Sequence, residues 1–347
     1  VLKKIATRSI VVSSFLTSLF CIIFSKFLED RYHQSQELSK WLMISGLTVF
    51  LVAEITNIQY WLTRKERFGA LASNQVLQST SIVFFQLIMG LLWKGGLVGL
   101  ITGTIMGQLV GFVAIKIRTP ELRGPIPDNA PSMLSLMRRY RKMPLLNGPN
   151  VLVDSVRNMG INLLIGSVAV AALGQFQLAW AIMQVPVGLI AGSVSQVFLK
   201  KLAVVEHGKM SGLVRFTLIR AAFAAIGPFA LLFVLAPWLF PFVFGAQWDQ
   251  AGYFAQALTP WLYMTVLTSP ISNIFVVTEN QRRMLIFAVL YCVVPLLWLW
   301  FSPLALLPTV FALGGLMALM LGVMLLLAWK CAVDFDRKPP ACESSIS

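Results

Sequence analysis

The sequence predicts an all-α protein that crosses a membrane many times, and two observations carry this prediction. The chain contains ten long apolar segments, and the turns between them alternate between Lys/Arg-rich and Lys/Arg-poor. Hydrophobic residues make up 57% of the chain and charged residues 12%, whereas soluble domains carry roughly 25% charged residues. Most segments approach the roughly 20 residues that a helix needs to cross a hydrocarbon core. We expect helices over 8–28, 41–62, 70–92, 96–117, 146–170, 174–197, 216–240, 253–277, 284–301 and 304–329.

The positive charge predicts how these helices are oriented. The chain has a net charge of +14, and 23 of its 28 Lys and Arg residues lie at every second turn, against four at the opposite turns. Lys and Arg accumulate on the cytoplasmic side of membrane proteins, so we expect the basic turns and both termini to lie in the cytoplasm. Because the cations are spread over many turns, they do not indicate nucleic-acid binding, and we expect them to attract anionic membrane lipids.

The helices are expected to form two groups. We expect an incomplete N-terminal lobe of four spans over 1–117 and a C-terminal lobe of six spans over 146–330. A cytoplasmic loop over 118–145 would join the two lobes. The loop is first Pro-rich and then basic and helix-like, and residues 331–347 would form a cytoplasmic tail. The fourth segment repeats glycine at every fourth position, which allows helices to approach closely. These glycines are Gly99, Gly103, Gly107 and Gly111.

A weak internal sequence similarity favours two related halves. The tripeptides TNI at 56–58 and SNI at 272–274 each lie near the end of a helix that runs toward the cytoplasm, just before a basic turn. Pseudo-symmetric halves are common in transporters, and chance similarity between helix ends is the alternative. If the halves are related, the pair 146–170 and 174–197 has no counterpart, and the first half lacks two leading helices.

Three ionisable residues lie well inside predicted spans, namely Glu54, Asp154 and Arg157. Each costs about 2.5–3.5 kcal/mol at the centre of a membrane helix, so we expect them to face a bundle interior or an aqueous cavity. Asp154 and Arg157 are three residues apart, which places them on one helix face where they can pair. Amides extend this polar face at Asn150, Asn158 and, less squarely, Asn162.

This pattern indicates a substrate cavity inside the membrane. In that interpretation Arg157 meets an anionic group of the substrate, while Glu54 or Asp154 takes up a coupling proton or cation. Amides such as Gln78, together with Trp180 and Trp261, are of the kind that binds sugars. The alternatives are a structural Asp–Arg pair and amides that simply hydrogen-bond between helices.

Catalysis and metal binding are not indicated. The four cysteines are isolated in the sequence, and the only two histidines lie in predicted loops. The sequence contains no CxxC or Cys/His cluster and no Gly-rich phosphate loop of the Walker type. We therefore expect no metal, no cofactor and no enzymatic activity.

Several segments follow one another in an order that is typical of one transporter family. They are GLITGTIMGQLVG (99–111), RYRKMPLLNGPNVLVDSVRNMGINLLIG (139–166), PVGLIAGSVSQVF (186–198), FGAQWDQAG (244–252) and TPWLYMTVLTSPISNIF (259–275). With this set the chain resembles, over nearly its whole length, the Wzx-type oligosaccharide flippases. These proteins form the polysaccharide-biosynthesis branch of the MATE/MOP superfamily, which also holds multidrug extruders.

The resemblance implies two six-helix lobes around a central cavity that opens alternately to each side of the membrane. The implied cargo is an undecaprenyl-pyrophosphate-linked oligosaccharide for lipopolysaccharide O-antigen, capsule or exopolysaccharide. It would be moved from the cytoplasmic to the outer leaflet of the bacterial inner membrane. Arg157 matches the basic cavity residues that meet the pyrophosphate or acidic sugars. Coupling to a proton or sodium gradient is also implied, with other polysaccharide-assembly proteins as partners.

Three alternatives stay open. The family usually has twelve helices or more, and the ten expected here match it without the first two, so a non-transporting fragment or scaffold is one alternative. A multidrug or small-cation extruder of the same superfamily is a second alternative, although it would need acidic cavity residues without Arg157. A membrane glycosyltransferase, polymerase or ligase acting on the same lipid would need large outer loops, and the expected outer turns are short.

Overall fold

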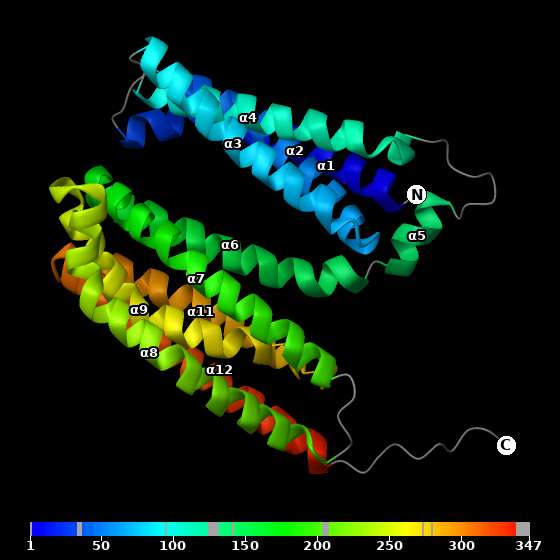
Figure 1. Cartoon of the computed structure of the whole chain (residues 1–347), viewed down its shortest axis with the longest axis vertical. Coiled ribbons are helices and arrows are strands. Elements are labelled where there is room, and N and C mark those ends of the chain that lie inside the picture. The colour runs from blue at the N-terminus through cyan, green and yellow to red at the C-terminus, as the bar shows by residue number, and fades with distance from the viewer. Residues whose placement is uncertain are drawn as a thin grey trace. The chain divides into compact units, whose positions relative to one another are not determined.

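The structure is a computed structural model that describes residues 2–32, 37–93, 96–123, 132–140, 142–202, 208–272, 274–278 and 280–337. Within these residues it contains only helices and their connections (Figure 1), which confirms the predicted all-α class. Ten of the α-helices are long: α1 (Leu2–Tyr32), α2 (Glu37–Arg64), α3 (Phe68–Trp93), α4 (Gly96–Arg118), α6 (Lys142–Val168), α7 (Val170–Leu202), α8 (Met210–Phe244), α9 (Asp249–Ile271), α11 (Gln281–Phe301) and α12 (Leu306–Arg337).

The short elements lie in connections. The predicted loop 118–145 contains the 3-10 helix η1 (Pro120–Arg123) and then α5 (Met133–Tyr140), so its basic run is helical as expected. The predicted span 253–277 is interrupted: α9 ends at Ile271, and α10 (Ile274–Val277) is a separate single turn. Pro270 lies in the last turn of α9 and has no N–H for the helical ladder, which weakens the end of this helix.

Seven of the long helices are long and apolar enough to cross a membrane, judged by length and composition. They are α1, α4, α6, α7, α8, α11 and α12. The other three are α2, which carries Glu54 and Asn57, α3, and α9, which carries Asp249 and Gln256. The chain is thus a multi-pass membrane protein, and the crossing of all ten helices stays a prediction.

The helices fall into two compact units, Val1–Arg141 (the N-terminal unit) and Lys142–Ser347 (the C-terminal unit). In the N-terminal unit α2 packs against α1, α3 and α4, and α3 packs closely along α4. The predicted glycine row makes this possible. A Cβ atom added to Gly103 would lie 2.6 Å from the backbone nitrogen of Gln86, and one added to Gly107 would lie 2.5 Å from that of Ile82.

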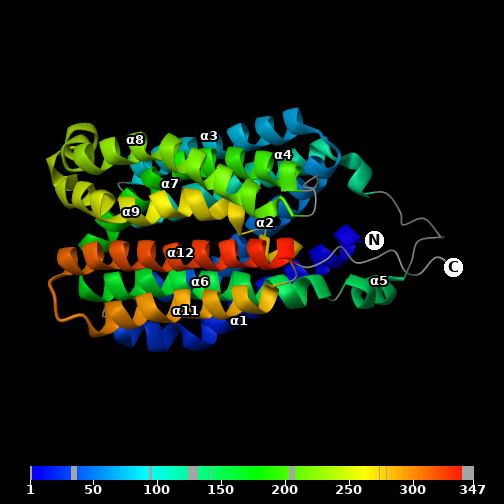
Figure 2. The same cartoon turned by 90° about the horizontal axis from the view of Figure 1, so that it is seen from below.

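The C-terminal unit is organised around α9. This helix packs against α7, α8 and α12, while α6 packs against α11, as Figure 2 shows. Small residues bring the backbones together: a Cβ atom added to Gly252 would lie 2.8 Å from the Cα atom of Pro237 on α8, and one added to Gly314 would collide with the carbonyl oxygen of Ala257. The resulting core is filled with large side chains such as Phe176, Phe254 and Trp261.

Candidate functional site

Arg157 lies on α6, and its side chain turns into the C-terminal unit. The residue is only 9% exposed. Its Nη2 atom forms the predicted ion pair with the Asp154 carboxylate one turn earlier, and it also donates to Oδ1 of Asn158 at 3.3 Å. The guanidinium carbon lies 4.5 Å from the ring centroid of Tyr291 on α11, within the range of a cation–π interaction.

One donor of this guanidinium has no protein partner. The Nε atom of Arg157 is buried and makes no hydrogen bond within the described part of the chain. A buried donor that is left unsatisfied costs about 1–3 kcal/mol. Because this Nε has almost no exposed surface, an oxygen atom from outside the protein can reach it only if neighbouring side chains move.

A cavity of about 340 Å³ lies beside this residue, and we call it the Arg157 cavity. Its polar wall comes from α6, through Asn150, Asp154 and Arg157. Its opposite wall comes from α11 and α12 and is apolar or aromatic: Met284, Phe287, Ala288, Tyr291, Leu321 and Met324. One face therefore carries an Asp–Arg ion pair and an amide, and the other suits hydrocarbon or sugar rings.

Aromatic side chains connect this cavity to the core. The indole nitrogen of Trp261 donates to the hydroxyl of Tyr291 at 2.5 Å. The rings of Trp180 and Trp261 have centroids 4.8 Å apart. These two Trp residues line a space of only about 20 Å³ together with Asn158 and Asn162, which is room for about one water molecule. In this conformation the two indoles are packed against each other.

Asn162 and Gln78 lie in helix contacts. The Oδ1 atom of Asn162 accepts a 2.6 Å hydrogen bond from Gln177 on α7. Hydrogen bonding between helices was the alternative to sugar binding for such amides. Gln78 lies on α3, where a Cβ atom added to Gly111 of α4 would approach its Cγ to 2.9 Å. It is not among the residues that line the cavities described here.

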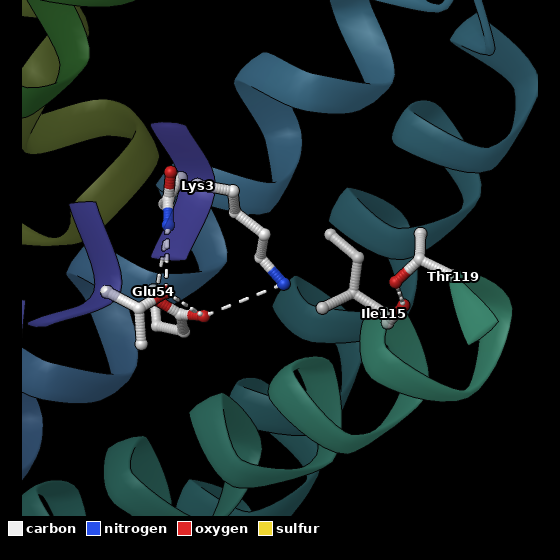
Figure 3. Close-up of polar contacts among 6 residues, drawn as sticks. Lys3, Glu54, Ile115 and Thr119 are labelled. Atoms are coloured by element: carbon white, nitrogen blue, oxygen red, sulfur yellow. Dashed lines mark hydrogen bonds and ion pairs between the residues drawn. The ribbon is translucent and has the colours of Figure 1, made fainter. Parts of the chain in front are cut away.

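Glu54 lies in the other unit and is surrounded by donors. It is 1% exposed on α2. Its carboxylate accepts hydrogen bonds from the hydroxyl of Thr7 at 3.0 Å and from the amide of Asn57 at 3.3 Å. The ammonium nitrogen of Lys3 lies 4.0 Å away, and Figure 3 shows this side chain reaching toward the carboxylate. The structure thus places Glu54 in the bundle interior, as expected, and supplies it with partners.

A second cavity, of about 330 Å³, adjoins Glu54 and is lined by cations. We call it the basic cavity. Its lining residues are Lys3, Lys4, Thr7, Arg8, Glu54, Lys116, Thr119 and Leu122. All of them belong to α1, α2 or the end of α4 and the turn that follows it, so this cavity is built entirely within the N-terminal unit.

Sequence reasoning missed two parts of these sites. Tyr291 supplies the ring beneath Arg157, and its only signal is that it is the single hydroxyl-bearing residue in 284–301. Lys3 is one of the cations of the basic turns and Thr7 has no distinguishing signal, because nothing local connects either residue to Glu54. Among the described residues, no group of three His, Cys, Asp or Glu side chains could hold a metal ion.

Comparison with known proteins gives a family and a fold. A family model described as "Polysaccharide biosynthesis protein" matches residues 3–253. An inward-facing multidrug resistance MATE transporter of the MOP superfamily superposes with a TM-score of 0.76 at 16% identity, covering 97% of this chain and 82% of that one. The lipid II flippase MurJ, in an inward closed conformation, gives 0.73 at 15% identity, covering 96% and 75%.

A MOP superfamily transporter from Pyrococcus furiosus, described as having a binding pocket of reverse polarity, gives a TM-score of 0.67 at 15% identity, covering 96% of this chain and 78% of that one. No match was found among curated protein sequences. At these identities the structural neighbours define the fold alone, which is that of the MATE/MOP transporters.

Proposed function

The chain belongs to the family of polysaccharide biosynthesis proteins, and from this premise we propose that it is a flippase for a lipid-linked oligosaccharide. The cargo would be an undecaprenyl-pyrophosphate-linked repeat unit of a cell-surface polysaccharide. It would move by alternating access from the cytoplasmic to the outer leaflet of the bacterial inner membrane, with both termini of the chain in the cytoplasm. The transporter fold supports movement across a membrane, and the family supports a polysaccharide precursor.

The observation that carries the proposal is the buried Arg157 on the wall of a cavity of about 340 Å³. Guanidinium groups bind phosphate through paired, charge-assisted hydrogen bonds, and they do so best where water is excluded. Tyr291 holds one face of the guanidinium, which leaves its edge for the ligand. We therefore assign Arg157 to the pyrophosphate or to an acidic sugar of the cargo.

The rest of the cavity suits the other parts of such a cargo. Asn150 supplies an amide on the polar wall, and Phe287 and Tyr291, which stack on each other with ring centroids 5.4 Å apart, add aromatic surface to the opposite wall. Met284, Leu321 and Met324 form an apolar wall against which an isoprenoid chain can lie. This mixture of cation, amide, aromatic and aliphatic groups favours an amphiphilic anion over a small hydrophilic one.

Asp154 and Glu54 are the proposed acceptors of the coupling proton or cation. Asp154 lies on the wall of the Arg157 cavity with its side chain 57% exposed, so solvent reaches it directly. Glu54 is buried in the N-terminal unit. If either residue couples transport to an ion gradient, the double variant Glu54→Gln/Asp154→Asn will lose the dependence of transport on that gradient. Gradient-driven transport that survives in the double variant would exclude both residues.

A multidrug or small-cation extruder of the same superfamily is the competing function. A cation would be repelled by the guanidinium of Arg157, whereas an anionic lipid would be attracted to it. Transport of organic cations by the purified protein, without movement of a lipid-linked oligosaccharide, would favour the extruder. Movement of neither would favour a non-transporting fragment.

The test is translocation by the full chain in proteoliposomes that contain a fluorescent undecaprenyl-pyrophosphate-linked oligosaccharide. Arg157→Ala should slow translocation about tenfold or more, because hydrogen bonds to charged groups contribute roughly 1.5–3 kcal/mol each. The matched control is Arg220→Ala, since Arg220 also lies over an aromatic ring, Phe216 at 4.0 Å, but outside the cavity. Wild-type rates for Arg157→Ala, or equal losses in both variants, would refute the assignment.

A further inference from the structure

We infer that the basic cavity of the N-terminal unit is a second anion site, which takes a phosphate or diphosphate group. The site is separate from the Arg157 cavity, because its lining residues all come from α1, α2, the end of α4 and the turn after α4. The inference concerns the charge and shape of this cavity, so it stands whether or not the proposed cargo is correct.

The balance of charge around the cavity strongly favours an anion. Four cationic side chains line it (Lys3, Lys4, Arg8 and Lys116), whereas Glu54 is its single carboxylate. A cation entering the cavity would meet four like charges, and their summed potential would exclude it. A phosphate group carries more than one negative charge and several acceptor oxygens, so it can engage several of these donors together.

The protein itself compensates only part of this charge. Glu54 lies 4.0 Å from Lys3 and has its remaining contacts with Thr7 and Asn57. Arg8 contacts the sulfur atom of Met133 at 3.2 Å, and a thioether is a neutral, weak acceptor. Within the described residues no carboxylate pairs with Lys4 or Arg8. These two side chains are therefore available to a ligand.

The walls of the cavity are fixed by bonds that do not use the cations. The hydroxyl of Thr7 is committed to Glu54, and that of Thr119 donates to the carbonyl oxygen of Ile115 at 2.8 Å, as Figure 3 shows. Glu54 and Thr119 are 1% exposed, whereas Lys4 and Arg8 are exposed. The polar groups at the base are rigid and satisfied, and the cations at the rim can move onto an anion.

Glu54 competes with that anion for Lys3. Its buried carboxylate draws the Lys3 ammonium inward, as Figure 3 shows. Replacing the carboxylate by an amide of the same shape would leave Lys3 for the ligand. The inference therefore predicts opposite effects for removing a rim cation and for neutralising Glu54, a pattern that general loss of structure cannot produce.

The experiment titrates inorganic pyrophosphate into the full chain in phosphatidylcholine nanodiscs, with isothermal calorimetry as the readout. Wild type should bind, and Lys4→Gln/Arg8→Gln should bind about tenfold more weakly, since two partly solvated charge contacts are lost. The matched control, Arg64→Gln/Lys65→Gln, removes the same charge from the end of α2 outside the cavity and should change affinity by less than about twofold. Glu54→Gln should bind about threefold more tightly.

A parallel titration in nanodiscs that contain phosphatidylglycerol identifies the natural source of the phosphate group. Weaker apparent pyrophosphate affinity there would mean that lipid headgroups occupy the cavity, and equal affinity would indicate a soluble or cargo-borne phosphate. The inference is overturned if wild type does not bind pyrophosphate in phosphatidylcholine, or if the control pair weakens binding as much as the cavity pair. Because the readout is binding, a failed translocation assay leaves this result unaffected.

Discussion

In the N-terminal unit the buried charge is a carboxylate, whereas in the C-terminal unit it is a guanidinium. The side chain of Glu54 is 2% exposed and its partner Lys3 is 22% exposed; the side chain of Arg157 is 11% exposed and its partner Asp154 is 57% exposed. Each unit thus keeps one sign of charge inside and leaves the opposite sign nearer to solvent. The two pairs have reversed polarity.

The pairs also differ in how completely the buried member is satisfied. The carboxylate of Glu54 receives hydrogen bonds from Thr7 and Asn57 besides the nearby ammonium of Lys3. Arg157 has an ion pair, one amide and an aromatic ring, yet its Nε remains without a hydrogen bond. A satisfied buried charge holds helices together, while an unsatisfied one is prepared for a ligand. The following predictions rank four side chains by their expected effect on stability.

Glu54→Ala is expected to have the largest effect. It removes the acceptor for two donors, Thr7 on α1 and Asn57 on α2, and it leaves Lys3 without its carboxylate. We expect the free energy of unfolding to fall by about 2–3 kcal/mol, because hydrogen bonds to charged groups are stronger than neutral ones. Chemical unfolding in detergent measures this change, with Glu54→Gln, which keeps an acceptor, as the milder comparison. Unaltered stability in Glu54→Ala would remove Glu54 from the role of a helix clamp.

Tyr291→Phe tests the aromatic support beneath Arg157. The change keeps the ring but removes the hydroxyl that accepts from the buried Trp261 indole. An unsatisfied buried N–H should lower the free energy of unfolding by about 1–2 kcal/mol. Tyr263→Phe is the matched control, since its hydroxyl makes only a long 3.4 Å bond to the carbonyl oxygen of Ala222. An equal decrease in the free energy of unfolding in the two variants would show that the Trp261–Tyr291 hydrogen bond does not contribute more to stability than the long Tyr263 bond.

Arg157→Met should change stability by less than about 1 kcal/mol, because the apolar side chain removes the desolvation cost of a buried charge and the carboxylate left behind is already solvated. The variant removes the unsatisfied Nε, and the Asp154 carboxylate that it leaves behind is exposed. The same unfolding measurement applies. A decrease in the free energy of unfolding as large as that of Glu54→Ala would mean that the two buried charges play the same structural role. The two units would then not differ in the way proposed.

Asp154→Asn should have the smallest effect, about 0.5 kcal/mol, because the amide keeps an oxygen that can accept a hydrogen bond from the Arg157 guanidinium. The side chain of Asp154 is more than half exposed. Unfolding measured at low and high salt checks this value, since salt screens an exposed carboxylate. A clear destabilisation that disappears in high salt would show that the pair contributes more than its exposure suggests.

Much of the fold follows from local sequence. The ten long helices were predicted from apolar segments, because hydrocarbon crossing imposes length and composition on each helix separately. The close α3–α4 contact was anticipated from glycines four residues apart, and the Asp154–Arg157 pair from their spacing of three. Each of these features depends on residues within one helix. The break between α9 and α10 was missed, although Pro270 and Ser272 mark it.

The sites depend on contacts that local patterns do not encode. Thr7 reaches Glu54 from 47 positions away, and the ring beneath Arg157 comes from α11. Helix packing in three dimensions sets both, and a single sequence contains no signal for it beyond the presence of a compatible side chain. For the same reason the sequence could not show that Asn162 accepts a hydrogen bond from Gln177 beside the small space that Trp180 and Trp261 line.

We propose that Arg157 binds the cargo and contributes little to the stability of the fold. The most direct test measures the translocation rate and the unfolding midpoint of Arg157→Met side by side, with Arg220→Met as the control. We predict translocation about tenfold slower or more for Arg157→Met, with an unfolding midpoint like that of wild type and an unaffected control. Wild-type translocation by Arg157→Met, or slow translocation accompanied by an equally large loss of stability, would contradict the account.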